Sequence, residues 1–295
     1  MGLGLGLGIW WPTQTSIIPG LLKALCARAT YCENKLCTTA TLEEIAAVRY
    51  TAPVLPIGLL ADYPGASAAY SLRNLIDTAT SVVRVRRSND NTEQDFTSEE
   101  ITDGTLTTFT GANDGFVTTW YDQSGNSVNA TQTTATAQPK LVSSGVIELV
   151  NGKPCLELDR YSPKKHFILD NVITGTQSTF LVHKKIGEGG TKYIYDGNAA
   201  TTRNYAITIG ESFQIQNKRN TYVNGSLVDR ADPTVQNLLM INLLANSQDI
   251  GTLFARYTAL ENYPGRVQEM IFYPTNEIAN RTGIETNINT EYTIY

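Results

Sequence analysis

The sequence predicts a mainly β protein built on an antiparallel β-sandwich. From about residue 66 onward, short runs of β-branched and aromatic residues alternate with Gly, Asn and Asp, which favours many short strands joined by turns. Asn-Gly pairs at Asn151 and Asn224 stand between such runs and indicate two hairpins. Charged residues make up only 17% of the chain, and uncharged polar residues replace them, which suits strands with one face in water.

The expected strands follow one another along the chain. They span residues 82–86, 115–121, 145–150, 154–158, 178–183, 193–195, 205–209, 213–215, 221–228, 238–244 and 266–273. In the first of these, Val83 and Val85 share one face. We expect Arg84, Arg86 and Arg87 to be solvated and paired with the nearby acidic residues Asp90, Glu93 and Asp95.

A terminal helix is expected over residues 276–292. Ile284, Ile288 and Tyr292 recur there at intervals of four residues, which places them on one helix face. We expect this helix to close over one edge or end of the sandwich.

The first twenty residues form a distinct segment. Gly alternates with apolar residues and disfavours a helix, the run is too short to cross a bilayer, and a secretory leader is not expected because no cation precedes Lys23. We expect residues 1–20 to be an anchoring arm that docks on a partner or a second copy of the chain, residues 21–65 to be a helical segment and linker, and residues 66–295 to be the sandwich. The anchoring side chains would be Leu3, Leu5, Leu7, Ile9, Trp10 and Trp11.

Composition excludes several classes of function. The net charge is −5 and the isoelectric point is about 5.2, so the basic surface that nucleic-acid binding requires is not expected. The chain has two His, His166 and His183, which rules out a three-His zinc site. His183 precedes two lysines at a strand end and is expected to face solvent. We expect no membrane insertion and find no phosphate-binding loop.

Three segments resemble the start of the catalytic domain of the arabinofuranosidase B family. They are residues 69–73 (AYSLR), residues 83–90 (VRVRRSND) and residues 120–126 (WYDQSGN). The first of these corresponds to a helix in that family. Residues 224–225 and 265–273 are similar to LamG and concanavalin A-like jelly rolls, and a helix at 280–289 (NRTGIETNIN) resembles one in virion proteins of tailed bacteriophages. The resemblance, over residues 66–295, implies a concanavalin A-like jelly roll.

The same resemblance implies two catalytic carboxylates, as retaining glycosidases use. Their positional counterparts here are Glu211 as nucleophile and Asp249 as acid. Neither stands in a local sequence that matches the family's motif. The family's structural disulfides are missing as well, because Cys155 is the one Cys between residues 66 and 295. We therefore do not expect the hydrolase chemistry to be retained.

The residues 122–126 motif has a structural interpretation. The Asp122 side chain can accept backbone N–H groups in an Asx-turn, Gly125 can supply a positive φ, and Trp120 and Tyr121 then pack on opposite faces of the strand. The alternative is a calcium site formed by Asp122 and Asn126 with Asn113 and Asp114. No other cofactor is expected.

Aromatic side chains stack on sugar rings, so a glycan site could use tyrosines in loops. The candidates are Tyr161, Tyr205, Tyr257 and Tyr263.

The main expectation for function is a non-enzymatic structural protein of a bacteriophage virion, located in a tail, fibre or capsid. It would bind other virion proteins through its arm, assemble as a homo-oligomer in the host cytoplasm, and attach to host glycan or decorate the particle. The alternatives are a glycoside hydrolase of arabinofuranosidase type and a structural module without a ligand.

Overall fold

The computed structural model describes most of the expected sandwich. The described residues are 58–158, 164–186, 191–197, 206–209, 212–215, 220–228, 237–242, 248–259 and 262–295. The predicted arm, with its apolar side chains Leu3, Leu5, Leu7, Ile9, Trp10 and Trp11, and the predicted helices before residue 50 lie outside these residues. In the described part of the chain, no helix is both long enough and apolar enough to span a bilayer.

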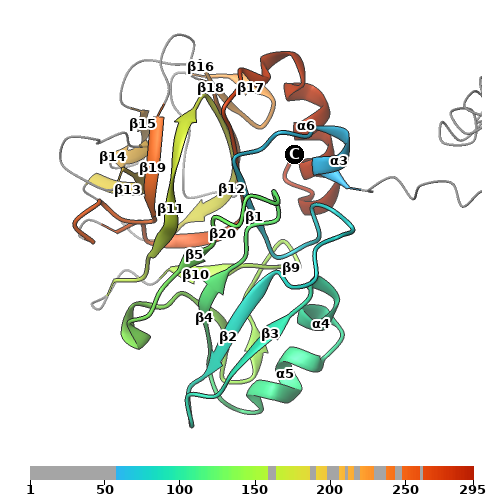
Figure 1. Ribbon diagram of the computed structural model, residues 1–295, viewed down its shortest axis with the longest axis vertical. Coiled ribbons are helices and arrows are strands. Elements are labelled where there is room, and N and C mark those ends of the chain that lie inside the picture. Colours follow the sequence, from blue (N-terminus) through green and yellow to red (C-terminus); the bar gives the residue numbers. More distant parts are fainter. Residues whose placement is uncertain are drawn as a thin grey trace, which may run out of the picture. The chain divides into compact units, whose positions relative to one another are not determined.

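One half of the fold is organised around strand β20. It pairs with β1 and β10 along one side and with β12 along the other, and β18, β16 and β17 continue outward from β12, all antiparallel (Figure 1). These strands are β20 (Gly265–Tyr273), β1 (Ala68–Ser71), β10 (Leu156–Leu158), β12 (Ser178–Lys185), β18 (Asn237–Asn242), β16 (Asn220–Val223) and β17 (Ser226–Leu227).

The other half runs from β3 to β15 in a second antiparallel series. Its order is β3 (Glu93–Phe96), β2 (Val83–Arg87), β4 (Gly115–Trp120), β5 (Ala130–Thr131), β11 (Phe167–Thr176), β19 (Gln248–Leu253), β13 (Thr191–Asp196), β14 (Ala206–Ile209) and β15 (Ser212–Ile215). Strand β6 (Lys140–Ser143) pairs with both β4 and β10 and so joins the two halves. Strand β7 (Val146–Ile147) pairs with β6, and β8 (Leu149–Val150) forms a hairpin with β9 (Lys153–Pro154).

A hydrophobic core fills the space between the two halves. Trp120 on β4 is fully buried, and its ring centroid lies 5.6 Å from that of Tyr70 on β1 and 6.3 Å from that of Phe167 on β11. The ring of Tyr195 on β13 meets that of Phe272 on β20 edge-to-face, with centroids 5.7 Å apart. Aromatic contacts across the gap show that the curled sheet encloses one core, which confirms the predicted antiparallel β-sandwich.

A second apolar cluster lies on the outer face of β12 and β20. There Phe180, Val182, Ile271 and Tyr273 pack against α3 (Leu59–Asp62) and α6 (Arg281–Tyr292). The buried apolar positions of α6 are Ile284, Ile288 and Tyr292, as the sequence predicts, but the helix covers a sheet face, not an edge or end. Both faces of β12 and β20 are therefore buried, and this explains the unbroken apolar runs at residues 180–182 and 270–273.

The remaining helices are short. Helices α4 (Ser98–Thr102) and α5 (Thr105–Thr110) follow β3, and 3₁₀ turns span Ala135–Ala137 and Glu277–Ala279. A capping box begins α4, because the Thr97 side chain accepts from the backbone N–H of Glu100 and the Glu100 side chain accepts from that of Thr97.

The structure confirms the two predicted Asn-Gly turns but not the helix implied at residues 69–73. Asn151 and Gly152 adopt φ values of 49° and 73°, and Asn224 and Gly225 adopt 50° and 77°, so both Asn-Gly hairpins are confirmed. The resemblance implied a helix at residues 69–73, and this is wrong because residues 68–71 are strand β1.

The charge pairing predicted for β2 is only partly correct. Arg84 pairs with Glu93 and Asp95, and Arg87 pairs with Asp90, as expected. Arg86 is buried, not solvated: its guanidinium donates to Gln138 Oε1 at 2.8 Å and to Asn91 Oδ1 at 2.8 Å.

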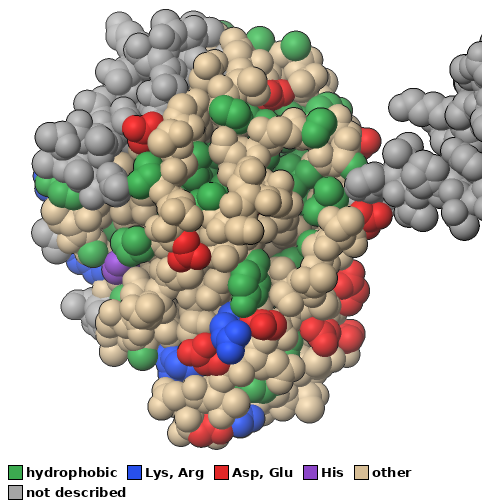
Figure 2. Space-filling model, in the orientation of Figure 1, with side chains coloured by type: hydrophobic (Ala, Val, Ile, Leu, Met, Phe, Trp, Pro, Cys, Tyr) green, Lys and Arg blue, Asp and Glu red, His purple; other side chains and the backbone are tan. Residues whose placement is uncertain are grey.

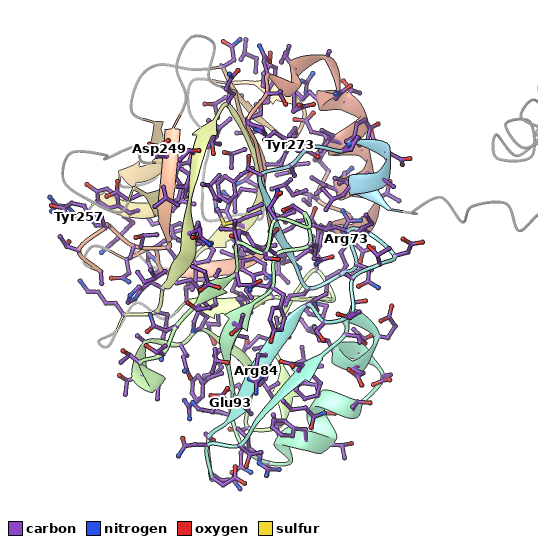
Figure 3. The ribbon with its side chains drawn as sticks, in the orientation of Figure 1. Arg73, Arg84, Glu93, Asp249, Tyr257 and Tyr273 are labelled. Atoms are coloured by element: carbon purple, nitrogen blue, oxygen red, sulfur yellow. The ribbon has the colours of Figure 1, made fainter. Side chains whose placement is uncertain are left out.

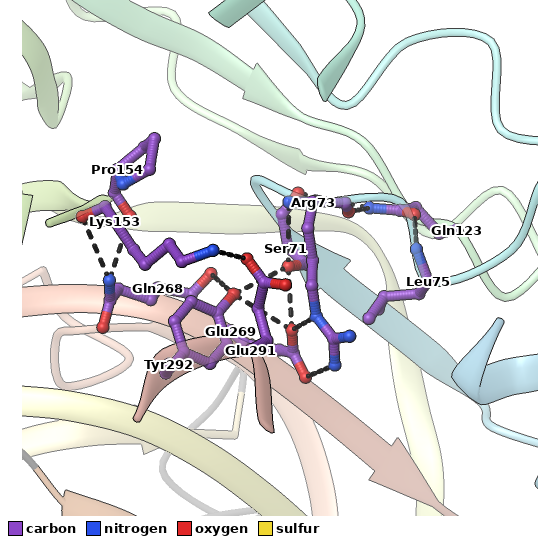
Figure 4. A network of polar contacts seen from close by, with 10 residues as sticks. All are labelled: Ser71, Arg73, Leu75, Gln123, Lys153, Pro154, Gln268, Glu269, Glu291 and Tyr292. Atoms are coloured by element: carbon purple, nitrogen blue, oxygen red, sulfur yellow. Dashed lines mark hydrogen bonds and ion pairs between the residues drawn. The ribbon is translucent and has the colours of Figure 1, made fainter. Parts of the chain in front are cut away.

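A buried carboxylate ties β1, β20 and α6 together (Figure 4). Glu269 on β20 accepts two hydrogen bonds from the Arg73 guanidinium, at 2.8 and 3.1 Å, and one from Ser71 Oγ at 2.9 Å. The Tyr292 hydroxyl on α6 donates to the same carboxylate at 3.1 Å. The Glu269 side chain is 1% exposed. Burial raises the pKa of the Tyr292 hydroxyl well above its usual value, and the negative charge of Glu269 adds to this, so Tyr292 stays a donor.

We predict that Glu269→Gln lowers the free energy of unfolding by about 3–5 kcal/mol, because the Arg73 guanidinium, whose side chain is only 19% exposed, would lose its counter-charge. The matched control is Glu291→Gln, which breaks the more exposed ion pair with Lys153 and should cost less than about 1 kcal/mol. Urea unfolding of both variants measures the difference. Equal losses would show that the buried pair has no special role.

Candidate functional site

A polar pocket lies where the loop between β1 and β2 faces the turn after β4. Its volume is about 360 Å³. It lies on the half of the molecule that carries β2, β3 and β4. The lining residues are Ile76, Thr78, Ala79, Thr80, Ser81, Asp95, Tyr121, Asp122, Gln123 and Gly125.

The floor of the pocket is the turn that begins at Asp122. Asp122 Oδ1 accepts from the backbone N–H of Ala69 at 2.8 Å and of Ser124 at 2.9 Å. Its Oδ2 accepts from Ser124 Oγ at 2.8 Å and from the N–H of Val128 at 3.1 Å. Gly125 has φ +88°. The predicted Asx-turn is thus confirmed, and the side chain also bonds to β1.

Gln123, in the same turn, bonds to the chain that leaves β1. Its Oε1 accepts from the backbone N–H of Leu75 at 2.7 Å, and its Nε2 donates to the carbonyls of Ser71 at 3.2 Å and Arg73 at 3.0 Å. The side chain is 6% exposed. Three bonds to one short loop hold that loop in place at the pocket's edge.

A carboxylate and a phenol meet on the third side. The Tyr121 hydroxyl donates to Asp95 Oδ1 at 2.7 Å, and Arg84 Nη1 lies 3.3 Å from the same oxygen. Partial burial and the bond to Asp95 raise the pKa of Tyr121, so the phenol stays protonated. Figure 3 places Arg84 and Glu93 on this part of the molecule, and Figure 2 shows basic and acidic side chains side by side there.

The geometry does not assemble the calcium alternative. Both oxygens of Asp122 already accept hydrogen bonds, and the Asn126 amide donates to the carbonyls of Ala66 and Ser67. Asn113 and Asp114 lie before β4, whereas Asp122 and Asn126 lie after it. The carboxylate of Asp114 bonds Ser144 N and pairs with Lys140. Among the described side chains, no three His, Cys, Asp or Glu are grouped so as to hold a metal ion.

The predicted catalytic pair is only partly visible. Glu211 lies outside the described residues. Asp249 is half-buried on β19, and its Oδ1 accepts from the backbone N–H of Gly175 on β11 at 3.1 Å (Figure 3). One carboxylate oxygen is thereby oriented by the neighbouring strand.

The predicted sugar-stacking tyrosines have different outcomes. Tyr161 and Tyr205 lie outside the described residues. Tyr257 is half-buried in the turn after β19, where its backbone N–H donates to Asp196 Oδ2 at 3.2 Å (Figure 3). Tyr263 is fully buried, so its prediction is wrong: its hydroxyl lies 2.6 Å from His183 Nδ1, and its ring fits against Gly265.

His183 and Tyr121 lie in environments that the sequence did not predict. His183 was expected in solvent but is 1% exposed, because β12 is covered on both faces. Its burial lowers its pKa to about 3. Tyr121 was expected only to pack on a strand face. Its hydroxyl bonds to Asp95. The sequence could not predict this contact, because it gave no pairing between the segments that carry Asp95 and Tyr121.

The fold of this chain is similar to that of proteins with solved structures. No protein-family model and no curated protein matches the sequence. Among solved structures, a mutant of GH54 α-L-arabinofuranosidase soaked with 4-nitrophenyl α-L-arabinofuranoside is similar over 76% of this chain, with 12% identity and a TM-score of 0.52. The GH54 α-L-arabinofuranosidase soaked with a cyclic sulfate inhibitor gives 13% identity and a TM-score of 0.50 over the same share. This chain covers 62% of each of those chains.

These similarities contradict our main expectation. The resemblance to arabinofuranosidases is confirmed at the level of the fold, and the solved proteins that share it are glycoside hydrolases. The interpretation as a non-enzymatic bacteriophage virion protein is therefore wrong, and the alternative that the sequence left open is the better supported one. The expected similarity to LamG proteins gains no support from these matches.

We predict that the free energy of unfolding falls as the pH drops from 6.5 toward 4, and that His183 accounts for part of the slope. The unfolded chain binds a proton at the ordinary His pKa of 6.5, whereas the folded chain keeps His183 neutral until about pH 3. The contribution approaches 1.4 kcal/mol per pH unit. Urea unfolding at pH 7, 6 and 5 should give a shallower slope for His183→Gln. Identical slopes would contradict the burial of this ring.

We predict that Asp122→Ala lowers the free energy of unfolding by about 2–4 kcal/mol, because three backbone N–H groups lose their acceptor. The control is Asp103→Ala, which removes an exposed carboxylate with a bond to Thr105 N and should have a smaller effect. If the turn instead held calcium, chelation would lower the melting temperature of the wild-type chain. We expect EDTA to leave it unchanged.

Proposed function

We propose that this chain is a glycoside hydrolase that acts on α-L-arabinofuranosides. The observation that supports this most is the similarity of its fold to GH54 α-L-arabinofuranosidases over 76% of the chain. The three sequence segments that resemble the arabinofuranosidase B family point in the same direction. Two of them, residues 83–90 and 120–126, form strands and turns beside the core.

The chemistry would use two carboxylates. In a retaining glycosidase, one carboxylate attacks the anomeric carbon while a carboxylic acid protonates the leaving oxygen, and water then releases the sugar from the enzyme. We assign the attack to Glu211 and the proton transfer to Asp249. The bond from Gly175 N to Asp249 Oδ1 would orient this carboxyl group and leave Oδ2 for the leaving oxygen.

The test is the release of 4-nitrophenol from 4-nitrophenyl α-L-arabinofuranoside by the full chain. We expect measurable turnover, and a loss of about 10²-fold or more in kcat for Glu211→Gln and for Asp249→Asn. The control is Asp170→Asn, which changes an exposed Asp on β11 that bonds Thr131. This variant should keep full activity.

Two results would overturn the proposal. One is wild-type chain that releases no more 4-nitrophenol than a heat-denatured sample, over a panel of aryl glycosides that includes the arabinofuranoside. The other is turnover that survives intact in both Glu211→Gln and Asp249→Asn.

A further inference from the structure

We infer that the pocket between the β1–β2 loop and the Asp122 turn is a binding subsite for an uncharged saccharide. Its residues come from β3, the end of β4 and the loop before β2, whereas Asp249 lies on β19. The inference therefore goes beyond the proposed hydrolysis and does not depend on which residues carry it out.

The size of the pocket suits a small ligand. Its volume of about 360 Å³ lies at the lower end of the range of small-molecule sites, about 300–1,000 Å³. A site of this size holds one or two sugar rings of a longer chain.

The lining combines the groups that recognise sugars. Thr78, Thr80 and Ser81 contribute hydroxyls from the loop, and Asp95 and Tyr121 belong to the same lining. A carboxylate has about four lone-pair positions for sugar hydroxyls. Asp95 Oδ1 accepts hydrogen bonds from the Tyr121 hydroxyl and from Arg84 Nη1, while Oδ2 accepts one long hydrogen bond of 3.4 Å from Arg84 Nη1. Oδ2 thus keeps room to accept from a ligand.

The aromatic ring adds an apolar contact. Tyr121 is half-buried, with its hydroxyl held by Asp95. Tyr121 lines the pocket, and because that bond orients the ring, little side-chain freedom is lost on binding. The C–H face of a sugar ring is the natural partner for it.

The charge of the lining selects against anions. The charged residues of the lining are Asp95 and Asp122. Arg84 is not part of the lining, and it pairs with both Asp95 and Glu93. A phosphate or a uronic acid would meet carboxylates and lack an opposing cation in the lining. An uncharged saccharide meets acceptors for its hydroxyls instead.

Hydrogen bonds hold the segments on which the site is built before any ligand binds. Gln123 holds the loop through Leu75, Ser71 and Arg73, and the four bonds to Asp122 fix the floor. A preorganised site loses less ordering free energy on binding than a mobile one. Weak binding of this kind would help to hold a polysaccharide on the enzyme, since a second contact raises the effective concentration at the first.

Isothermal titration of the full chain with uncharged trisaccharides tests the inference. The probes are arabinotriose, xylotriose and cellotriose, and trigalacturonate serves as the anionic comparison. We expect at least one uncharged probe to bind and trigalacturonate to bind at least about tenfold more weakly. Asp95→Asn and Tyr121→Ala should each weaken binding by about tenfold, and Tyr121→Phe, which keeps the ring, by less. Circular dichroism checks that each variant is folded.

The matched control is Asp90→Asn, which breaks the ion pair of Asp90 with Arg87 outside the pocket and should leave the affinity unchanged. The inference is overturned if no uncharged probe binds at about 10 mM, if trigalacturonate binds equally well, or if Asp95→Asn and Tyr121→Ala bind as tightly as wild type. Release of 4-nitrophenol by Asp95→Asn reports separately on the proposed hydrolysis, so either idea can fail without the other.

Discussion

One buried carboxylate, Glu269, imposes the strictest requirement on this fold. A charge that is 1% exposed is tolerated only if donors surround it. Arg73, Ser71 and Tyr292 supply them from the segment around β1 and from α6. Meeting this requirement fixes α6 against the outer face of the sheet and sets the direction of the chain as it leaves β1.

Because the chain leaves β1 in this direction, the loop that follows lies beside the Asp122 turn, and the pocket forms between them. The chain that leaves β1 through Arg73 is caught at Leu75 by the amide of Gln123, and Gln123 itself belongs to the turn that Asp122 organises. The groups that we propose to recognise carbohydrate therefore lie beside a network of buried polar bonds. Partly satisfied networks of this kind would be costly, whereas satisfied ones make a unique and rigid arrangement.

The sequence was informative where structure is decided locally. Asn151–Gly152 and Asn224–Gly225 determine their own turns, and the spacing of Ile284, Ile288 and Tyr292 defines a helix face, so these features could be predicted. The environments of Arg86 and His183 could not, because each depends on a partner at least 50 residues away: Gln138 for Arg86 and Tyr263 for His183. The pocket has the same origin, since Asp95 and Tyr121 meet only after β2 pairs with both β3 and β4. The Asp122 motif was correctly predicted to form a turn. That the same turn also lines a pocket could not be predicted, because no residue pattern distinguishes such a turn from any other.

The most direct test of this account is a crystal structure of the full chain soaked with the uncharged trisaccharide that binds most tightly. The account predicts a sugar ring against Tyr121 with a hydroxyl within hydrogen-bond distance of Asp95 Oδ2, and a loop at residues 73–81 that keeps its bonds to Gln123. Sugar density found only elsewhere, or a loop that has left Gln123 to admit the ligand, would contradict it.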